Sequence, residues 1–457
     1  VKRELGQRFG QNAIGTQGFE VVSTFEPETQ KFAELTLSRH LLELDALMGY
    51  RGPVARVDMT DPVWDQRFLS VENPSDFDKW QTALVLEVRN HRAGIVLDNG
   101  RMGRLTLQDV KWARKYSNGE KIHPLPWRVS DVVSVGDVIL VEPLSGATAS
   151  PIFDDTTPDL NRMAQRLRTR VNEKRSDLPT APRYRLRQNP ELNGSVVILD
   201  AKSSQVKAMV GGYSASQSAF NRATQAQRQP GSTIKPFVVL TALENGYRGW
   251  STLKDEEMTL TLKGGEIWTP KNAGGGFWGE MSMEQALVHS KNVPLVNLYY
   301  QLGHEKLNKT FEGLNLYDDY INTPSVVLGA NETSLLRLTA AYGALANGGT
   351  YREPTTIASV RDTHGELIYA SNNDLTVDCL ATAFCHRNEE TSVASYKAVQ
   401  RLKTILRKGM EEGTGKNVNK LLSETVYGKT GTTNGSRDAW FVGFTDDVVV
   451  GVFVGYD

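Results

Sequence analysis

The sequence contains few residues of the kinds that most often bind transition metals. Its only cysteines among 457 residues are Cys379 and Cys385, and two thiols alone cannot form a tetrahedral zinc site. A short-loop disulfide in an oxidising compartment and two free thiols both fit this pair. The seven histidines are scattered without ligand spacing. The sequence therefore indicates no metal site and no cofactor.

The sequence also lacks a long apolar run and an excess of either charge. No stretch of about 18 apolar residues occurs, so no printed segment is expected to span a membrane. Lysine and arginine number 52 and aspartate and glutamate 53, which gives a net charge of -1. This balance argues against the basic surface typical of proteins that bind nucleic acid.

Both ends of the sequence resemble cuts in a longer chain. Residues 1–5 include neither an initiator methionine nor the apolar region of a signal peptide, and residues 452–457 have the pattern of a strand interior. We therefore expect a fragment of a larger protein. Its length predicts two or three structural units, one of them with a substantial core.

Residues 1–80 are expected to form a linker region that contains one strand and one helix. The strand is predicted at 18–23, and the helix opens near Pro27 and stops near Gly49. The apolar residues of this helix predict a buried stripe of Phe32, Leu35, Leu42 and Leu44.

Residues 81–145 carry the alternating pattern of a small all-β domain. Strands are predicted at 83–88 and 93–97, followed by a hairpin turn at 98–100, a return at 105–107 and a last strand at 136–141. A barrel or a sandwich would fit this pattern. Residues 146–188 show little periodicity and are rich in Pro, Thr, Arg and Asp, so we expect a linker or an exposed insertion there.

Residues 189–457 combine strands at both ends with a helical centre. The predicted strands lie at 196–199, 206–210, 424–432, 439–445 and 448–454. Strands at both ends with helices between them predict a single antiparallel sheet flanked by helices. The fold class expected for the whole chain is therefore mixed α/β (α+β), with an additional small all-β domain.

Ser232 and Lys235 form the most informative pair in the sequence. A Ser-x-x-Lys string alone is weak evidence, because a chain of this length contains on the order of two by chance. Here Pro230 and Gly231 interrupt the chain first, and the apolar run that follows is typical of a helix buried in a core. Pro236 is tolerated only in the first turn of such a helix. The lysine amine would then lie one turn along the same helix face as the serine.

This placement predicts a nucleophile and its base. The start of a helix favours a developing oxyanion at Ser232. Lys235 must be neutral to accept a proton, and both burial and a second cation, Lys429, would lower its pKa. The alternative is a buried lysine that only pairs with a carboxylate.

Two further Ser-x-x-Lys strings, Ser204/Lys207 and Ser251/Lys254, occur in strand-like surroundings. Side chains three residues apart in a strand point to opposite faces, so neither pair can meet. Both are predicted to be surface pairs.

Ser290 and Asn292 follow a helix-like stretch at 283–289. Interpreted structurally, Ser290 is a cap and Asn292 a turn residue. Interpreted chemically, Ser290 relays a proton to a leaving amine, and the Asn292 amide holds the backbone of the acyl donor. A second Ser-x-Asn string, Ser371/Asn373, lies in an Asn-rich turn where local hydrogen bonding explains it.

Lys429 opens a Lys-Thr-Gly string in a strand-like segment. Gly431 leaves room for a peptide to lie along that strand, and the lysine with the Thr430 and Thr432 hydroxyls can hold a terminal carboxylate. The backbone N–H groups of Thr432 and Ser232 would form an oxyanion hole. The predicted substrate-binding residues are Thr430, Gly431, Thr432 and Thr433. Seen alone, such a string in a hairpin is more often structural.

The order of the three strings strengthens each of them. Together they predict a serine acyl-transfer site without histidine, whose catalytic residues are Ser232, Lys235, Ser290, Asn292 and Lys429. A phosphate loop is excluded, because the Gly-Thr-Gly-Lys string at 413–416 lacks both the first glycine and the final Ser or Thr.

These strings resemble those of penicillin-binding proteins and serine β-lactamases. Longer segments resemble the class A penicillin-binding proteins, namely 221–223, 228–237, 268–272, 429–433 and 438–441. The resemblance covers residues 193–457, and the unit at 81–145 is similar to the OB-like insertion of some Gram-negative members. It implies a transpeptidase fold beside an OB-like domain.

The resemblance implies a D,D-transpeptidase that crosslinks peptidoglycan stem peptides through an acyl group on Ser232. β-Lactams would be covalent inhibitors of that serine. Members of the family carry an N-terminal transmembrane helix and a glycosyltransferase domain. The parent protein is therefore expected to be bifunctional and periplasmic, anchored to the inner membrane only through a segment absent from this sequence.

A D,D-carboxypeptidase or a serine β-lactamase is the competing interpretation, because both share the site but transfer the acyl group to water. Class A β-lactamases use a Glu-x-x-Leu-Asn string, and here Glu312, Leu314 and Asn315 form one that is a residue short. We therefore expect a long-lived acyl-enzyme. The all-β unit has sparse aromatics and no basic stripe, which favours a protein partner or a spacer over nucleic acid.

Overall fold

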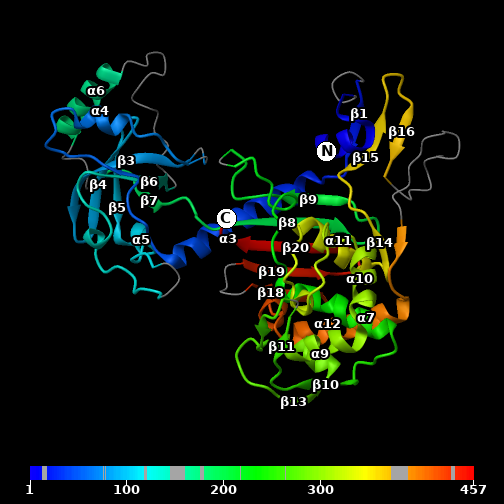
Figure 1. Cartoon of the computed structure of the whole chain (residues 1–457). Helices are drawn as coiled ribbons and strands as arrows, with labels where there is room; N and C mark the ends of the chain where they lie inside the picture. Colours follow the sequence, from blue (N-terminus) through cyan, green and yellow to red (C-terminus); the bar gives the residue numbers. More distant parts are fainter. Residues whose placement is uncertain are drawn as a thin grey trace. The chain divides into compact units, whose positions relative to one another are not determined.

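The computed structural model describes residues 1–12, 18–75, 77, 79–117, 121–144, 160–174, 180–216, 218–262, 264–371, 390–433 and 438–457. The chain forms two compact units, one made of Val1–Leu37 with Asn193–Asp457 and the other of Ser38–Leu192 (Figure 1). Cys379, Cys385 and Asn373 lie outside the described residues, so the disulfide stays a prediction. Among the helices described, none has the length and apolar character needed to cross a bilayer.

The larger unit is built on one five-stranded sheet in the order β18-β19-β20-β8-β9, and every neighbouring pair is antiparallel. Its strands are β8 (Asn193–Asp200), β9 (Val206–Val210), β18 (Tyr427–Thr432), β19 (Asp438–Phe444) and β20 (Val448–Gly455). The first and last strands of residues 193–457, β8 and β20, pair with each other inside the sheet (Figure 1). The predicted single antiparallel sheet is confirmed, and its two edge strands are β18 and β9.

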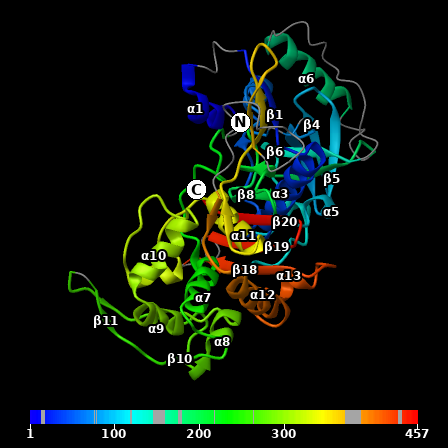
Figure 2. The same ribbon diagram turned by 90° about the vertical axis from the view of Figure 1, so that its right-hand side faces the viewer.

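Helices α7 (Lys235–Glu244), α11 (Leu335–Ala346) and α12 (Tyr396–Glu411) link the sheet to the rest of the unit. Helix α11 packs on β8, β19 and β20, whereas α12 packs on β18, α7 and α8 (Met283–Val288) (Figure 2). Helix α7 is buried on all sides, because residues 235–243 are all buried. The prediction of a central apolar helix after Ser232 is therefore confirmed.

The remaining elements of this unit surround that core. They are α1 (Lys2–Phe9), β1 (Glu20–Ser23), η3 (Gly231–Ile234), β10 (Thr252–Asp255), β11 (Leu260–Thr261), β12 (Ile267–Trp268), β13 (Gly279–Ser282), α8 (Met283–Val288), α9 (Val293–Leu302), α10 (His304–Gly313), η4 (Pro324–Leu328), β14 (Thr350–Arg352), β15 (Ile357–Arg361), β16 (Leu367–Ala370), β17 (Glu390–Ser392) and α13 (Lys416–Asn419).

The helix predicted from Pro27 is α3 (Pro27–Met48), but its buried face differs from the predicted stripe. Phe32 is 69% exposed, Leu35 64% and Leu44 40%. Residues four apart stack along one side of a helix, and the residues that are buried here are Ala33, Leu37, Leu41 and Asp45. The stripe was predicted from the large apolar residues and not from the spacing of four. Phe32 and Leu35 therefore lie on the side of α3 opposite the buried residues.

The smaller unit contains a six-stranded antiparallel sheet in the order β2-β6-β3-β4-β5, with β7 also paired to β6. Its elements are β2 (Ala55–Arg56), α4 (Trp64–Leu69), β3 (Gln81–Arg89), β4 (Arg92–Leu97), β5 (Met102–Thr106), α5 (Leu107–Val110), η1 (Val129–Asp131), β6 (Asp137–Pro143), α6 (Leu160–Lys174) and β7 (Tyr184–Arg187). A bridge between Arg104 and Arg183 joins β5 to the start of β7, so the strands form a small barrel. The predicted return strand ends at Thr106, because helix α5 begins at Leu107.

Residues 146–188 contain more structure than the predicted linker. Helix α6 buries Leu167 and Val171 on one face of the sheet, and β7 buries Tyr184 and Leu186 on the other. The linker prediction is therefore wrong for α6 and β7. The apolar periodicity that would predict a helix or a strand is weak in these two elements, because their few apolar residues are separated by many charged ones.

Candidate active site

Ser232 lies in the short 3-10 helix η3, which runs directly into α7 at Lys235. The structure thus replaces the predicted α-helical start by a 3-10 turn, in which residues i and i+3 lie above one another. Ser232 is half-buried, whereas Lys235 is 0% exposed. Pro236 occupies the first turn of α7, as predicted.

Gly231 brings this turn against the edge strand β18. Its φ is 55°, and a Cβ on it would lie 2.6 Å from the carbonyl oxygen of Thr432. Only glycine adopts this conformation at such a close approach without strain. The backbone of η3 therefore packs directly on the strand that carries Lys429.

The amine of Lys235 points to the turn between α8 and α9. Its Nζ donates to the carbonyl oxygens of Ser290 at 2.6 Å and Lys291 at 3.1 Å, to Asn292 Oδ1 at 2.6 Å, and to Ser290 Oγ at 3.4 Å. Within the described residues, none of these hydrogen bonds goes to Ser232. Contacts between a nucleophile and its base are often loose before substrate binds.

Ser290 connects the two lysines. Its hydroxyl accepts a hydrogen bond from Lys429 Nζ at 2.9 Å and the longer one from Lys235 Nζ at 3.4 Å. Its φ is 54°, a left-handed conformation uncommon for a residue other than glycine. Ser290 thus occupies the position that a proton relay between the two amines requires.

Asn292 is the residue before helix α9, and both the oxygen and the nitrogen of its side-chain amide form hydrogen bonds. Its Oδ1 accepts from Lys235, and its Nδ2 donates to the carbonyl oxygen of Lys271 at 2.7 Å. The sequence predicted contact with an acyl donor, but these bonds also give Asn292 a structural task. It joins the loop at residue 271 to the base.

From Lys429 to Thr432, successive side chains of β18 alternate between the buried and the more exposed face of the strand. Lys429 and Gly431 are buried, and Thr430 and Thr432 lie on the other face, half-buried and exposed. A Cβ on Gly431 would come within 2.6 Å of the Pro230 carbonyl oxygen. Thr433 Oγ1 accepts from the Asp438 N–H at 3.1 Å, which closes the end of the strand pair.

Because side chains alternate along the strand, Lys429 lies on the opposite face from the Thr430 and Thr432 hydroxyls, but Thr414 links Lys429 to Thr430. Thr414 Oγ1 lies 3.5 Å from Lys429 Nζ and accepts from Thr430 Oγ1 at 2.8 Å. Thr414 was not among the predicted site residues, because nothing in the spacing of residues 413–416 indicates these hydrogen bonds.

Burial changes the protonation of both lysines. Burial, and secondly the charge of Lys429, hold the pKa of Lys235 well below its usual value. Burial lowers the pKa of Lys429 to about 7. The direction of this shift favours the neutral form of Lys235, which is the form that a base requires.

The two other Ser-x-x-Lys pairs are not brought together. Lys207 lies on β9 and pairs with Glu26 at 2.7 Å, and Lys254 is exposed on β10. The predicted surface position is wrong for Ser204, which is only 3% exposed in its turn. Its burial follows from the tight turn between β8 and β9.

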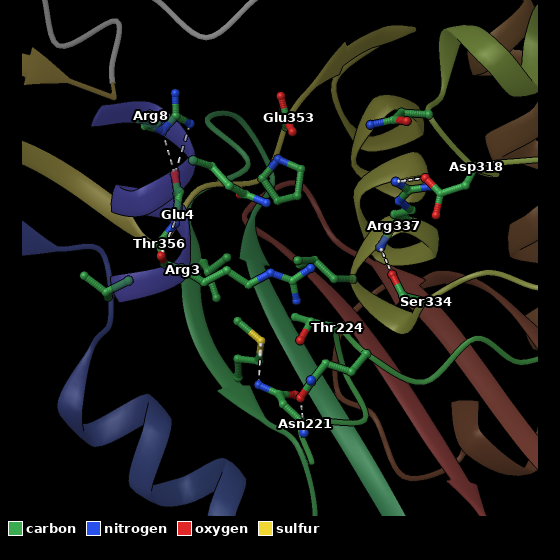
Figure 3. A pocket seen from close by; sticks show the side chains of 18 of the residues that line it. Arg3, Glu4, Arg8, Asn221, Thr224, Asp318, Ser334, Arg337, Glu353 and Thr356 are labelled. Atoms are coloured by element: carbon green, nitrogen blue, oxygen red, sulfur yellow. Dashed lines mark hydrogen bonds and ion pairs between the residues drawn. The ribbon is translucent and has the colours of Figure 1, made fainter. Parts of the chain in front are cut away.

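A cavity of about 670 Å³ lies away from these residues, between α1, the β9 strand and the start of α11 (Figure 3). None of the predicted site residues lines it. Its charged groups are largely paired, since Glu4 contacts Arg8 and Thr356, and Arg337 contacts Asp318. It is therefore not the candidate active site.

Comparison with known proteins agrees with this geometry. A family model described as a penicillin binding protein transpeptidase domain matches residues 194–455, and one described as a penicillin-binding protein OB-like domain matches residues 50–192. Penicillin-binding protein 1A of Rickettsia typhi is 32% identical over 449 residues, which cover 96% of this chain and 51% of the relative. The Neisseria flavescens protein of that name is 31% identical over 462 residues, 100% of this chain and 51% of the relative.

The crystal structure of penicillin-binding protein 1A from Haemophilus influenzae has a TM-score of 0.77 at 25% identity, and the match covers 100% of this chain and 65% of that one. The chain spans about half the length of the curated relatives it matches. A family model over most of the larger unit, a second over the barrel and relatives above 30% identity lead to one assignment. The chain belongs to the class A penicillin-binding proteins, in which it corresponds to the transpeptidase and OB-like domains.

Proposed function

We propose that this chain is a D,D-transpeptidase that crosslinks peptidoglycan stem peptides through an acyl-enzyme on Ser232. One observation carries the proposal. A buried lysine three residues after Ser232 and a second lysine on an edge strand share the hydroxyl of Ser290, at 3.4 Å and 2.9 Å. These hydrogen bonds connect the proposed base to the strand along which a peptide can bind.

In the first half-reaction, Ser232 Oγ attacks the carbonyl carbon between the two D-alanines, and neutral Lys235 accepts its proton. The N–H groups of Ser232 and Thr432 stabilise the oxyanion. The carbon–nitrogen bond then breaks, and the leaving amine of D-alanine takes a proton through the hydroxyl of Ser290. In the second half-reaction, an amine of another stem attacks the ester carbonyl carbon, and the bond to Ser232 Oγ breaks as the new amide bond forms. The proton that the amine loses returns through Lys235 to Ser232 Oγ.

The donor peptide lies along β18, the edge of the sheet, in the manner of an added strand. Lys429 in its charged form attracts the terminal carboxylate, and the hydroxyls of Thr430 and Thr432 lie on the solvent side of the strand. β-Lactams present a carboxylate and a reactive amide in the same order, so they acylate the same serine.

Transfer to water by a carboxypeptidase or β-lactamase is the second candidate. Its support would be a carboxylate that activates water in the site. Glu312, the one suggested by the sequence, is exposed on α10 and accepts a hydrogen bond from Asn308 at 2.7 Å. The described contacts of Glu312 therefore favour a long-lived acyl-enzyme.

The test combines intact mass spectrometry with an exchange reaction. Penicillin is expected to add one mass equivalent that persists, with turnover below about one per second. A peptide ending in D-Ala-D-Ala, incubated with a labelled D-amino acid, is expected to give the exchanged peptide in addition to any hydrolysis. Hydrolysis without exchange would identify the carboxypeptidase instead.

We also propose that the parent protein lies in the periplasm of a Gram-negative envelope and is anchored to the inner membrane. The support is the length of the relatives, of which this chain covers about half. An upstream glycosyltransferase domain would make that protein bifunctional. A protein partner remains our prediction for the OB-like unit.

The pKa directions predict how acylation depends on pH. The charge of Lys429 helps to lower the pKa of Lys235, so replacing Lys429 by methionine is expected to raise that pKa. Lys235 then loses its proton only at higher pH. The acidic limb of the second-order rate of penicillin acylation is expected to move to higher pH, whatever the loss in the maximal rate. An unmoved limb would show that the limb reports another group.

A further inference from the structure

A buried polar cluster lies behind the active-site turn and has no part in the steps above. Its members are Asp255 at the end of β10, Asn272 in the loop before β13, and Lys291 between Ser290 and Asn292. Their exposed fractions are 0%, 6% and 6%. Buried polar groups are costly unless paired, so this cluster needs a physical reason.

Asn272 caps helix α9 from a distance in the sequence. Its Oδ1 accepts from the backbone N–H of Asn292 at 2.9 Å and of Val293 at 3.2 Å. These are among the first N–H groups of a helix, which have no partner inside it. Asn292 makes no side-chain cap of its own. The start of α9 is therefore held by a side chain from another loop.

Asp255 and the carbonyl oxygen of Gly276, which accepts from Asn272 Nδ2 at 3.0 Å, together fix which way the Asn272 amide faces. A carboxylate only accepts hydrogen bonds, and Asp255 Oδ1 receives one from Asn272 Nδ2 at 2.7 Å. The oxygen of the amide is thereby directed to α9. Asp255 Oδ2 also accepts from the Trp278 N–H at 3.0 Å and lies 3.5 Å from Lys291 Nζ.

Lys291 completes the enclosure of the turn. Its ammonium group lies 4.0 Å from the centre of the Trp278 ring as well as beside Asp255. The side chain of Lys291 thus holds the turn from behind, while its carbonyl oxygen accepts from Lys235 on the active-site side. One residue joins the cluster to the base.

We propose that Asn272 and Asp255 are positioning residues for acylation, which hold residues 290–292 so that Ser290 and Asn292 meet Lys235. The inference rests on the proposed function, because it acts through Lys235 and Ser290. Ser290 has a left-handed backbone, which persists only where its surroundings enforce it. Releasing the start of α9 relaxes that backbone and moves both the hydroxyl and the amide away from the amine.

The test measures the saturating acylation rate and the penicillin affinity of wild type and variants separately. Asn272→Ala removes the acceptor for the two N–H groups and is expected to lower the saturating rate about 100-fold, as small misplacements do. The affinity for penicillin is expected to change much less, since β18 and Lys429 are untouched. Asp255→Asn loses the carboxylate that orients Asn272 and is expected to lower the same rate.

The reciprocal double variant D255N/N272D separates positioning from simple destabilisation. It exchanges donor and acceptor, so the amide at position 255 can donate to the carboxylate at position 272. That carboxylate can still accept from the start of α9, where negative charge is favourable. The double variant is expected to acylate about 10-fold faster than D255N.

Asn297→Ala is the matched control. Asn297 also ties α9 to β10, through a 2.8 Å hydrogen bond to the Lys254 carbonyl oxygen, and this bond does not involve residues 290–292. This variant is expected to lose thermal stability and keep the wild-type acylation rate. If N272A does not fold, the comparison of D255N with the double variant decides.

The outcomes distinguish the two proposals. A wild-type protein that penicillin does not acylate would refute the proposed function itself. Rapid acylation of wild type together with an unchanged rate in N272A, or a double variant no faster than D255N, would refute the positioning role alone. An equal loss of rate in N297A would also refute it, because the effect would then follow general stability.

Discussion

Replacing Ser232 by alanine is expected to abolish every covalent product of the site. The variant cannot form an ester, so penicillin should add no mass at any time or concentration, and the exchange of D-alanine should fall to the background rate. Removing a nucleophile costs about 10⁶-fold in rate in enzymes of comparable chemistry. The measurement is intact mass spectrometry after prolonged exposure to penicillin. The fold is expected to survive, because the half-buried Ser232 loses only its hydroxyl.

Ser251→Ala is the matched control for this variant. Ser251 also begins a Ser-x-x-Lys string and is also half-buried, but it precedes β10 rather than a buried helix. We expect this control to acylate at the wild-type rate. A mass adduct that survives in Ser232→Ala, or disappears in Ser251→Ala, would contradict the assignment of the nucleophile.

Replacing Lys235 by methionine is expected to have the second largest effect. Methionine keeps much of the buried volume but cannot accept a proton, and a positioned base contributes about 10²–10⁴-fold to a rate. Acylation should therefore become slow without disappearing, because Ser232 remains. Stopped-flow or quenched mass measurements over minutes to hours would follow it. A rate within a factor of about two of wild type would show that Lys235 is not the base.

The same substitution has a predictable cost in stability. It leaves the carbonyl oxygens of Ser290 and Lys291, to which Lys235 donates at 2.6 Å and 3.1 Å, without that donor. A buried acceptor without its partner costs about 1–3 kcal/mol. Against this, the native protein no longer has to bury an amine. We therefore expect a small change in melting temperature. Lys254→Met, which replaces the exposed lysine of β10, is the control, and we expect it to change neither the melting temperature nor the acylation rate.

The sequence predicted those elements whose signal is local and repeated along the chain. The alternation of β8, β19 and β20 and the apolar run of α7 place strands and helix as the structure has them. The buried stripe of α3 and the helix α6 were missed. In both cases the contact surface is set by a few side chains at helical spacing, which larger or more highly charged neighbours obscure.

The site residues divide in the same way. Ser232, Lys235 and Lys429 were identifiable because their strings are short and recur in a known order. Asn272 and Thr414 carried no chemistry of their own in the sequence. Each acts through a hydrogen bond to a residue far along the chain, and no spacing rule reports such a partner.

The sequence by itself determined the class of chemistry, since a hydroxyl, two amines and a glycine-bearing strand occur in one order without a histidine to replace them. Only the tertiary structure decided that the pKa of each of the two lysines is lowered. The pKa of a lysine depends on its burial and on the charges around it, and Lys235 and Lys429 meet at Ser290 only because α7, the turn before α9 and β18 pack together. Residues 235, 290 and 429 are far apart in the chain. They are therefore desolvated and hydrogen-bonded to one another only in the packed structure.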